Sequence, residues 1–170
     1  MRAVEKSDIE HVMNWVNDAE IIRWLPDLQL PVSRLAEQAY LERVVEREHP
    51  CDRYYTVETA DGEYLGAAGL HSIDWVNRRA ELGIILAKPG QGYGVDTVRT
   101  LLRVAFRGLN LEKVYLRTTG SNSRAIACYR KCGFGEIGRL KQHLWFRGKW
   151  EDEVFMEIFR DEWTEGGEQG

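Results

Sequence analysis

The stretch AKPGQGYGVDTVRTLLRVAF contains the residues whose type and spacing most strongly suggest chemistry. Its three glycines, Gly90, Gly92 and Gly94, fall between a predicted strand and a predicted helix. Glycine costs conformational entropy on folding, but it lets a ligand come close to the backbone because it has no Cβ. Backbone amides converge at a helix start, where the helix dipole adds positive potential. The loop is therefore either an anion site or a tight turn, and glycine spacing alone does not decide between them.

Two well-known phosphate-binding loops do not fit this stretch. A dinucleotide-binding G-x-G-x-x-G loop would need a glycine at the position of Val95. A Walker loop would need Gly-Lys-Ser or Gly-Lys-Thr after four intervening residues, and the sequence has neither there. An anion held here would belong to another class of ligand.

The elements that must position this loop follow from apolar periodicity and turn residues. One helix is predicted over 8–15 with Ser7 or Asp8 as its cap, and a second from Ser33 to about Glu48. The other segments are a hairpin around Asp61-Gly62, a strand over 78–87, a helix after the glycine loop, a strand over 112–119, a helix over 122–132 capped by Asn122 and ended by Gly133, and a hairpin turning near 147–149. This order predicts an α/β (or α+β) fold and disfavours a doubly wound dinucleotide fold, because strands and helices do not alternate regularly.

Composition excludes several classes of partner. The 170 residues carry a net charge of −4, which gives no electrostatic footprint for nucleic acid. No segment is apolar over the length of a membrane span, and the charged start MRAVEKSDIEHV lacks the apolar run of a secretory signal. Cys51, Cys128 and Cys132 have neither disulfide-framework nor metal-site spacing. We expect a cytoplasmic protein without a metal.

Three segments together resemble one known family. GQGYGVDTVRTLLRVAF is similar to the acyl-CoA loop and helix of the GNAT superfamily of N-acetyltransferases, and NSRAIACYRKCGF is similar to its second signature. NRRAELGIIL resembles the strand whose backbone pairs with the pantetheine arm. The flanking segments resemble the subgroup of ribosomal-protein N-terminal and spermidine acetyltransferases. The chain departs from the family pattern at Pro89, where the motif has Gln or Arg.

The resemblance implies a fold and a set of ligand contacts. The implied fold is a mixed, mostly antiparallel sheet of about seven strands with helices on both faces, in one domain over 1–164 followed by a disordered tail over 165–170. Acetyl-CoA is the implied co-substrate. The residues that would hold it are Ile84, Ile85, Leu86, Gly90, Gln91, Gly92, Tyr93, Gly94, Val95, Asn122, Ala125 and Tyr129.

The resemblance also assigns two catalytic roles. Tyr129 would protonate the departing CoA thiolate, although its place in an apolar helical stripe also suits a core tyrosine. Glu81 would take the proton of the amine, directly or through water. The alternative for Glu81 is a cross-strand ion pair with Arg78 or Arg79.

The expected function is acetyl transfer from acetyl-CoA directly to a primary amine in a ternary complex. The acceptor is a small amine, such as a polyamine or an aminoglycoside, or a protein N-terminus. Two alternatives remain open: an acyltransferase that uses a larger acyl-CoA, and a catalytically silent CoA-binding module. The resemblance is also compatible with a homodimer.

Overall fold

The computed structural model describes residues 1–25, 30–46, 49–88, 91–146 and 148–165. Its elements in chain order are η1 (Lys6–Asp8), α1 (Ile9–Trp15), α2 (Ala19–Ile22), α3 (Arg34–Val45), β1 (Arg53–Glu58), β2 (Tyr64–Asp74), β3 (Arg79–Leu86), α4 (Tyr93–Arg103), η2 (Val104–Gly108), β4 (Lys113–Thr119), α5 (Ser123–Lys131), β5 (Gly135–Phe146) and β6 (Lys149–Phe159). Every predicted strand and long helix is therefore present.

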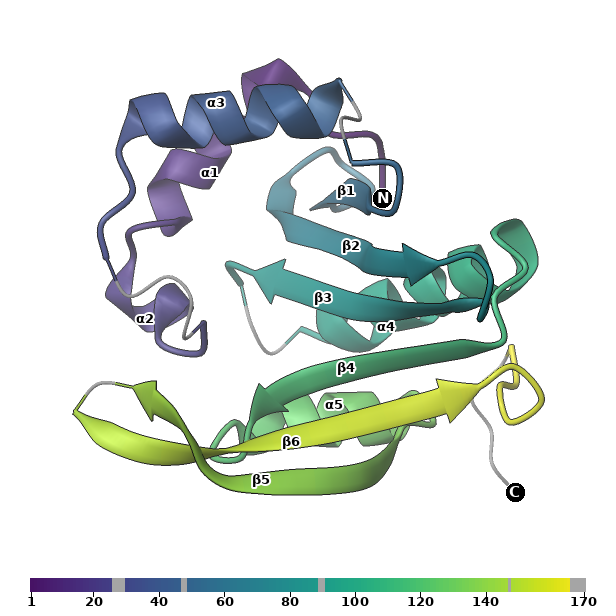
Figure 1. The fold of residues 1–170 in the computed structure, drawn as a ribbon. Helices are drawn as coiled ribbons and strands as arrows, with labels where there is room; N and C mark the ends of the chain where they lie inside the picture. The colour runs from purple at the N-terminus through teal and green to yellow at the C-terminus, as the bar shows by residue number, and fades with distance from the viewer. Residues whose placement is uncertain (26–29, 47–48, 89–90, 147, 166–170) are drawn as a thin grey trace.

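The strands form one mixed sheet in the order β1-β2-β3-β4-β6-β5 (Figure 1). All neighbours are antiparallel except β3 and β4, which run parallel. The predicted mixed, mostly antiparallel sheet is confirmed, with six strands in the described part of the chain where about seven were expected. The parallel pairing is short: it covers three residues of each strand and ends at Glu81 and Tyr115.

Alternate residues of β3 face opposite sides of this sheet, as the pleat requires. Ala80 and Leu82 are buried in the main core, to which α4 and α5 contribute. Ile85 packs instead against the cluster around Trp15 of α1. Figure 1 shows α4 and α5 behind the sheet, with α1 and α3 next to β1 and β2 at its other end. The contacts of β3 therefore place helices on both faces.

The two helices behind the sheet have the local signals that the sequence predicts. The apolar stripe of α4 is fully buried at Val98, Leu101 and Leu102. The side chain of Asn122 caps α5 by accepting a hydrogen bond from the Ala125 amide at 3.1 Å. Gly133 follows α5 with a φ of +96°, in the left-handed region that glycine adopts without strain. One feature was not predicted: α4 continues into the π-helical turn η2.

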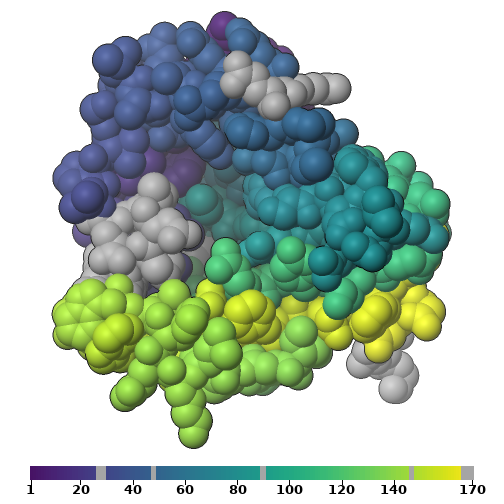
Figure 2. All heavy atoms as spheres, viewed as in Figure 1, coloured from purple at the N-terminus to yellow at the C-terminus, as the bar shows by residue number. Residues whose placement is uncertain are grey.

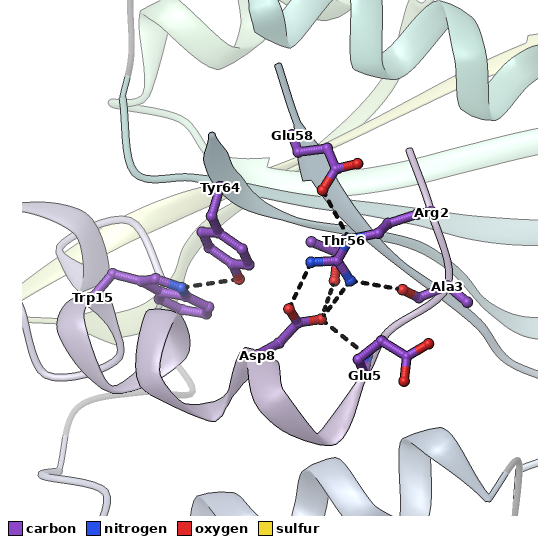
Figure 3. A network of polar contacts seen from close by, with 8 residues as sticks. All are labelled: Arg2, Ala3, Glu5, Asp8, Trp15, Thr56, Glu58 and Tyr64. Carbon is purple, nitrogen blue, oxygen red and sulfur yellow. Dashed lines mark hydrogen bonds and ion pairs between the residues drawn. The ribbon is translucent and has the colours of Figure 1, made fainter. Parts of the chain in front are cut away.

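Asp8 is the N-cap residue of α1, as predicted, but its side chain makes no capping hydrogen bond to that helix. Asp8 is only 2% exposed. It accepts hydrogen bonds from Arg2 at 2.7 and 2.9 Å and from the Thr56 hydroxyl at 2.7 Å (Figure 3). Arg2 also donates to Glu58 at 2.8 Å. This network ties the start of the chain to β1.

Two other predicted segments end at or beside residues outside the described ranges. Ser33 caps α3 as predicted by accepting from the Ala36 amide at 3.2 Å. The helix ends at Val45, and the predicted end near Glu48 lies outside the described residues. The single domain and the disordered tail stay predictions. Glu165 forms ion pairs with Arg103 and Arg107, whereas 166–170 lie outside the described residues.

Candidate active site

A cleft of about 1090 Å³ lies between the N-terminal helices and the strands on either side of the β3–β4 junction. In Figure 2 a recess opens between the blue N-terminal helices and the green β5–β6 hairpin. Beyond Glu81, β3 has no partner strand on the β4 side among the described residues. The cleft therefore exposes strand backbone, and its lining includes the predicted Ile84, Ile85, Leu86, Gly92, Gly94, Val95, Asn122, Ala125 and Tyr129 as well as Glu81.

The glycine loop leads into α4 at the rim of this cleft. Gly92 is the N-cap of the helix with a φ of +83°, a conformation that most side chains resist. A Cβ added at Gly94 would lie 3.2 Å from the sulfur of Cys128, so α4 and α5 approach closely here. The first amides of a helix lack partners within the helix and can receive an anion. Gln91 and Tyr93 do not line the cleft, and Gly90 and Pro89 lie outside the described residues.

Tyr129 reaches the cleft from α5 and is 7% exposed. Its ring packs against Phe134 with centroids 5.9 Å apart, so the residue has the core contacts of the alternative interpretation as well. Burial raises the pKa of the hydroxyl, and the neighbouring Cys128 and Cys132 add to the shift. A hydroxyl that keeps its proton at neutral pH can donate it to a thiolate.

Glu81 is paired, but not with the partners that the sequence suggested. Its Oε1 lies 2.9 Å from Nε of Arg117 on β4. Arg78 instead pairs with Glu112 at 2.6 Å, and Arg79 pairs with Asp74 at 3.4 Å. The idea of an ion pair between strands was therefore correct, and the choice of partner was wrong.

Several polar cleft residues were missed by sequence reasoning. Glu153 of β6 is 5% exposed and lies 3.4 Å from Arg117. The hydroxyl of Thr119 is buried and has no hydrogen-bond partner in the described part of the chain. Glu37 and Tyr40 of α3 face the same cleft. The available signal was the concentration of polar residues at the end of β4, in Arg117-Thr118-Thr119, directly before the Asn122 motif.

The described residues also bear on the class of ligand. They contain no group of three or more His, Cys, Asp or Glu side chains that could hold a metal ion. Cys128 of α5 and Cys132, which follows the helix, are free thiols, and the Cys132 thiol donates to the Val95 carbonyl at 3.7 Å. None of the helices in the described ranges has the length and apolar character needed to cross a membrane.

Comparison with known proteins agrees with this geometry. Residues 1–135 match the model of the acetyltransferase (GNAT) domain. The chain is 30% identical over 171 residues to spermidine N(1)-acetyltransferase of Vibrio cholerae, covering 99% of this chain and 96% of that protein. It is 27% identical over 154 residues to aminoglycoside N(6')-acetyltransferase type 1 of Klebsiella pneumoniae, covering 82% and 75%.

A solved structure is also similar over nearly the whole length. The spermidine N-acetyltransferase from Vibrio cholerae in complex with CoA and spermine superposes with a TM-score of 0.85 and 28% identity, covering 95% of each chain. These likenesses agree with the geometry of the cleft and the glycine loop. The chain belongs to the GNAT family and is an acetyl-CoA-dependent N-acetyltransferase that acetylates an amine.

Proposed function

We propose that the amine acceptor is a small polycation of the polyamine class. The observation that carries this proposal is the set of carboxylates in the cleft walls, Glu37 on α3, Glu81 on β3 and Glu153 on β6. Glu81 and Glu153 meet at the Arg117 guanidinium, and Glu37 comes from a helix in another wall of the cleft. The cleft therefore offers acidic groups at two places, which suits a ligand with more than one positive charge. The two spermidine acetyltransferase likenesses support the same class.

Glu37 is the carboxylate best suited to hold a distal ammonium. It is half-buried, and burial raises the pKa of its carboxyl group. A bound ammonium would offset that penalty, because an opposite charge nearby favours the ionised carboxylate. Tyr40 and Tyr54 also line the cleft, and aromatic faces attract cations as well.

The free edge of β3 and its Glu81 face suggest how the two substrates meet. CoA would lie along the free edge of β3 at Ile84, Ile85 and Leu86, with its pyrophosphate at the glycine loop. The amine would approach from the face on which Glu81 lies, so the transfer would be direct and would occur in a ternary complex. Strand amides would polarise the thioester carbonyl. Tyr129 would supply the proton that the CoA sulfur takes as its bond to the acetyl carbon breaks.

A thiol-release screen with acetyl-CoA tests the acceptor class. Spermidine and spermine should give the highest kcat/KM, above aminoglycosides, amino acids and N-terminal peptides. Glu37→Gln should raise the KM for polyamines about tenfold or more, since a hydrogen bond to a charged group is worth about 1.5–3 kcal/mol. The same change should leave the KM for a monoamine unaltered. Glu46→Gln, at an exposed carboxylate that pairs with Lys6, is the matched control.

The same screen separates the other candidates. A preference for aminoglycosides, which the Klebsiella pneumoniae likeness favours, or for N-terminal peptides would overturn the polyamine proposal and leave amine acetylation intact. Faster thiol release with a longer acyl-CoA would identify a larger acyl donor as the substrate. Tight CoA binding with no thiol release for any amine would indicate a silent CoA-binding module.

We also propose a cytoplasmic location, because the three free cysteines Cys51, Cys128 and Cys132 suit a reducing compartment. Fractionation of cells that express the tagged chain tests this. A protein found outside the cytoplasm would contradict it.

We also propose that the protein forms a homodimer through its β5–β6 hairpin. Trp145 and Trp150 pack edge to face there, with centroids 5.2 Å apart, and are 53% and 55% exposed. Exposed apolar patches of this kind mark interaction surfaces. The mass in solution by light scattering, compared with that of Trp150→Lys, is the test, and a monomeric parent protein would contradict the proposal.

A further inference from the structure

His71 occupies a position in the cleft that the assigned roles leave unused. It lies on β2 directly opposite Glu81 in the antiparallel ladder, so both side chains project from the same face of the sheet. Glu81, Gly83 and Ile85 share that face on β3, because alternate residues of a strand point the same way. His71 is a cleft-lining residue, as are Glu81 and Gly83. It therefore stands on the side from which the amine would approach.

Two glycines make room for the imidazole ring. Gly69 and Gly83 pair with each other across β2 and β3, and each lies two residues along its strand from His71 or Glu81. A Cβ added at Gly83 would lie 3.1 Å from Nε2 of His71, and one added at Gly69 would lie 2.9 Å from the same atom. The ring thus lies over this glycine pair and leans along β3 toward Ile84. Its Nε2 is therefore closer than the His71 backbone to the part of β3 that has no partner strand on the β4 side in the described part of the chain.

The ring is held by packing and keeps its nitrogens available. The Tyr54 ring stands 5.0 Å from it at 52°. In the described part of the chain, neither imidazole nitrogen has a hydrogen-bond partner. An imidazole that already donated and accepted within the protein could not accept a further proton. This one can.

Burial of the ring favours the neutral imidazole at physiological pH. Burial lowers the pKa of His71, and the carboxylates of Asp52 and Glu81 oppose that shift without cancelling it. Tyr54 on β1 is the other titratable group against the ring. Behind it, Tyr40 of α3 packs on Tyr54 with centroids 6.2 Å apart. Neutral imidazole is the form that accepts a proton.

We infer that His71 is a catalytic residue whose Nε2 takes the proton from the ammonium of the acceptor, while Glu81 attracts and orients that ammonium. Glu81 is less suited to the proton transfer because its carboxylate already accepts a charge-assisted hydrogen bond from Arg117. This assignment rests on the proposed acetylation of an amine in this cleft, and not on which amine is used.

The proton balance defines the step. A primary ammonium carries three protons and its amide product carries one, so two must leave the nitrogen. The first passes to His71 Nε2 and then to solvent, which frees the lone pair that attacks the thioester carbonyl carbon. The carbon–sulfur bond then breaks and Tyr129 protonates the sulfur. The second proton leaves the nitrogen as the amide forms and replaces the one that Tyr129 gave.

The pH dependence of kcat/KM tests this role. With the best amine from the screen, the wild-type value should rise with pH and level off above the pKa of His71, which lies below the reference of about 6.5 for histidine. His71→Gln should lower kcat/KM about 10²–10⁴-fold near pH 7. In this variant the rate should keep rising toward alkaline pH, because only amine that is already neutral can react. CoA affinity by calorimetry should not change. His11→Gln, at an exposed histidine stacked on Tyr64, is the matched control.

Two further variants distinguish proton transfer from a structural role. His71→Ala leaves a gap over Gly69 and Gly83, and added imidazole should restore its turnover in proportion to the neutral imidazole present. Gly83→Ala keeps His71 but pushes against its Nε2, so kcat should fall while CoA affinity remains. Loss of activity in folded His71→Ala without imidazole rescue would overturn the inference. So would His71→Gln with the wild-type pH profile. If no amine releases thiol even with the wild-type protein, the proposed function itself fails.

Discussion

Glu81 and Arg117 join β3 to β4 at the place where the backbone pairing of these strands ends. The last registered pair is Glu81 with Tyr115, and the Arg117 guanidinium on β4 reaches back to the Glu81 carboxylate at 2.9 Å. The same guanidinium lies 3.4 Å from Glu153, which ties in β6. Side chains thus hold β3 to the β4–β6 pair just where the backbones of β3 and β4 begin to separate. Glu81 therefore has an architectural role in addition to any chemical one.

Glu81→Gln separates charge attraction from proton transfer. If the carboxylate draws the ammonium into place, KM for the amine should rise about tenfold or more, because the charged hydrogen bond is lost, while the acid limb of the pH–rate profile remains. Glu112→Gln, which breaks the exposed pair with Arg78, is the control. If instead kcat falls and the acid limb disappears, Glu81 is the base that the sequence suggested and His71 is not.

The glycine loop is tested by a charge at its helix end. Gly92→Glu should abolish measurable CoA binding in calorimetry, because two negative charges about 4 Å apart repel by about 4 kcal/mol near a protein surface. Gly92→Asn is the control, since asparagine tolerates the left-handed backbone that this position needs. Equal CoA affinity in both folded variants would show that the pyrophosphate binds elsewhere.

Tyr129→Phe removes a hydroxyl and keeps the packing on Phe134. We expect kcat to fall about 10²–10⁴-fold when chemistry limits the rate, with CoA affinity and melting temperature near those of the parent. Tyr115→Phe, on β4 outside the cleft lining, should have no such effect. Full turnover of Tyr129→Phe in a single-turnover assay would assign the residue to the core alone.

The Asp8 network makes stability depend on pH at the acid end. Burial raises the pKa of Asp8, but hydrogen bonds from Arg2, Glu5 and Thr56 outweigh it and the net pKa is lowered. A folded-state pKa below the unfolded value of about 3.9 stabilises the protein above that pH. This stabilisation is lost as pH falls through the lowered pKa.

Asp8→Asn should therefore reduce the free energy of unfolding by about 3 kcal/mol at pH 7, and the gap to the parent should narrow as pH falls below 4. Denaturant melts at several pH values measure it. Glu10→Gln, which breaks the exposed pair with Arg34, should change stability by less than about 1 kcal/mol. A constant difference at every pH would mean that Asp8 contributes by packing rather than by charge.

Local patterns predicted the fold well because they act over a few residues. The Asn122 cap, the Asp61-Gly62 turn and the apolar stripe of α4 each depend on neighbours within one or two turns, and all are present. The cleft-lining glycine Gly94 and the burial of Tyr129 were found the same way, through motifs within single segments.

Long-range pairings were not predictable in this way. Asp8 has the sequence context of a helix cap, but its partner Thr56 lies 48 residues away. Glu81 stands two residues from Arg79 and yet pairs with Arg117, 36 residues away, because parallel strands bring them together. The space for the His71 ring depends on two glycines in different strands. A single sequence does not state which strands lie side by side, so such contacts became visible only in the folded chain.

The short β3–β4 pairing has a consequence for the protein without its co-substrate. Beyond Glu81, in the part of the chain that the structure describes, β3 and β4 have no strand partner on the sides that face each other, where most sheets would have a continuous ladder. An exposed strand edge is a template for another strand, and an extended ligand with amide groups can complete it. Co-substrate binding would then be the last step of sheet formation. The amides of Ile84 and Leu86 should exchange with solvent deuterium faster before binding than after it, while those of the fully paired Val114 and Leu116 should hardly change.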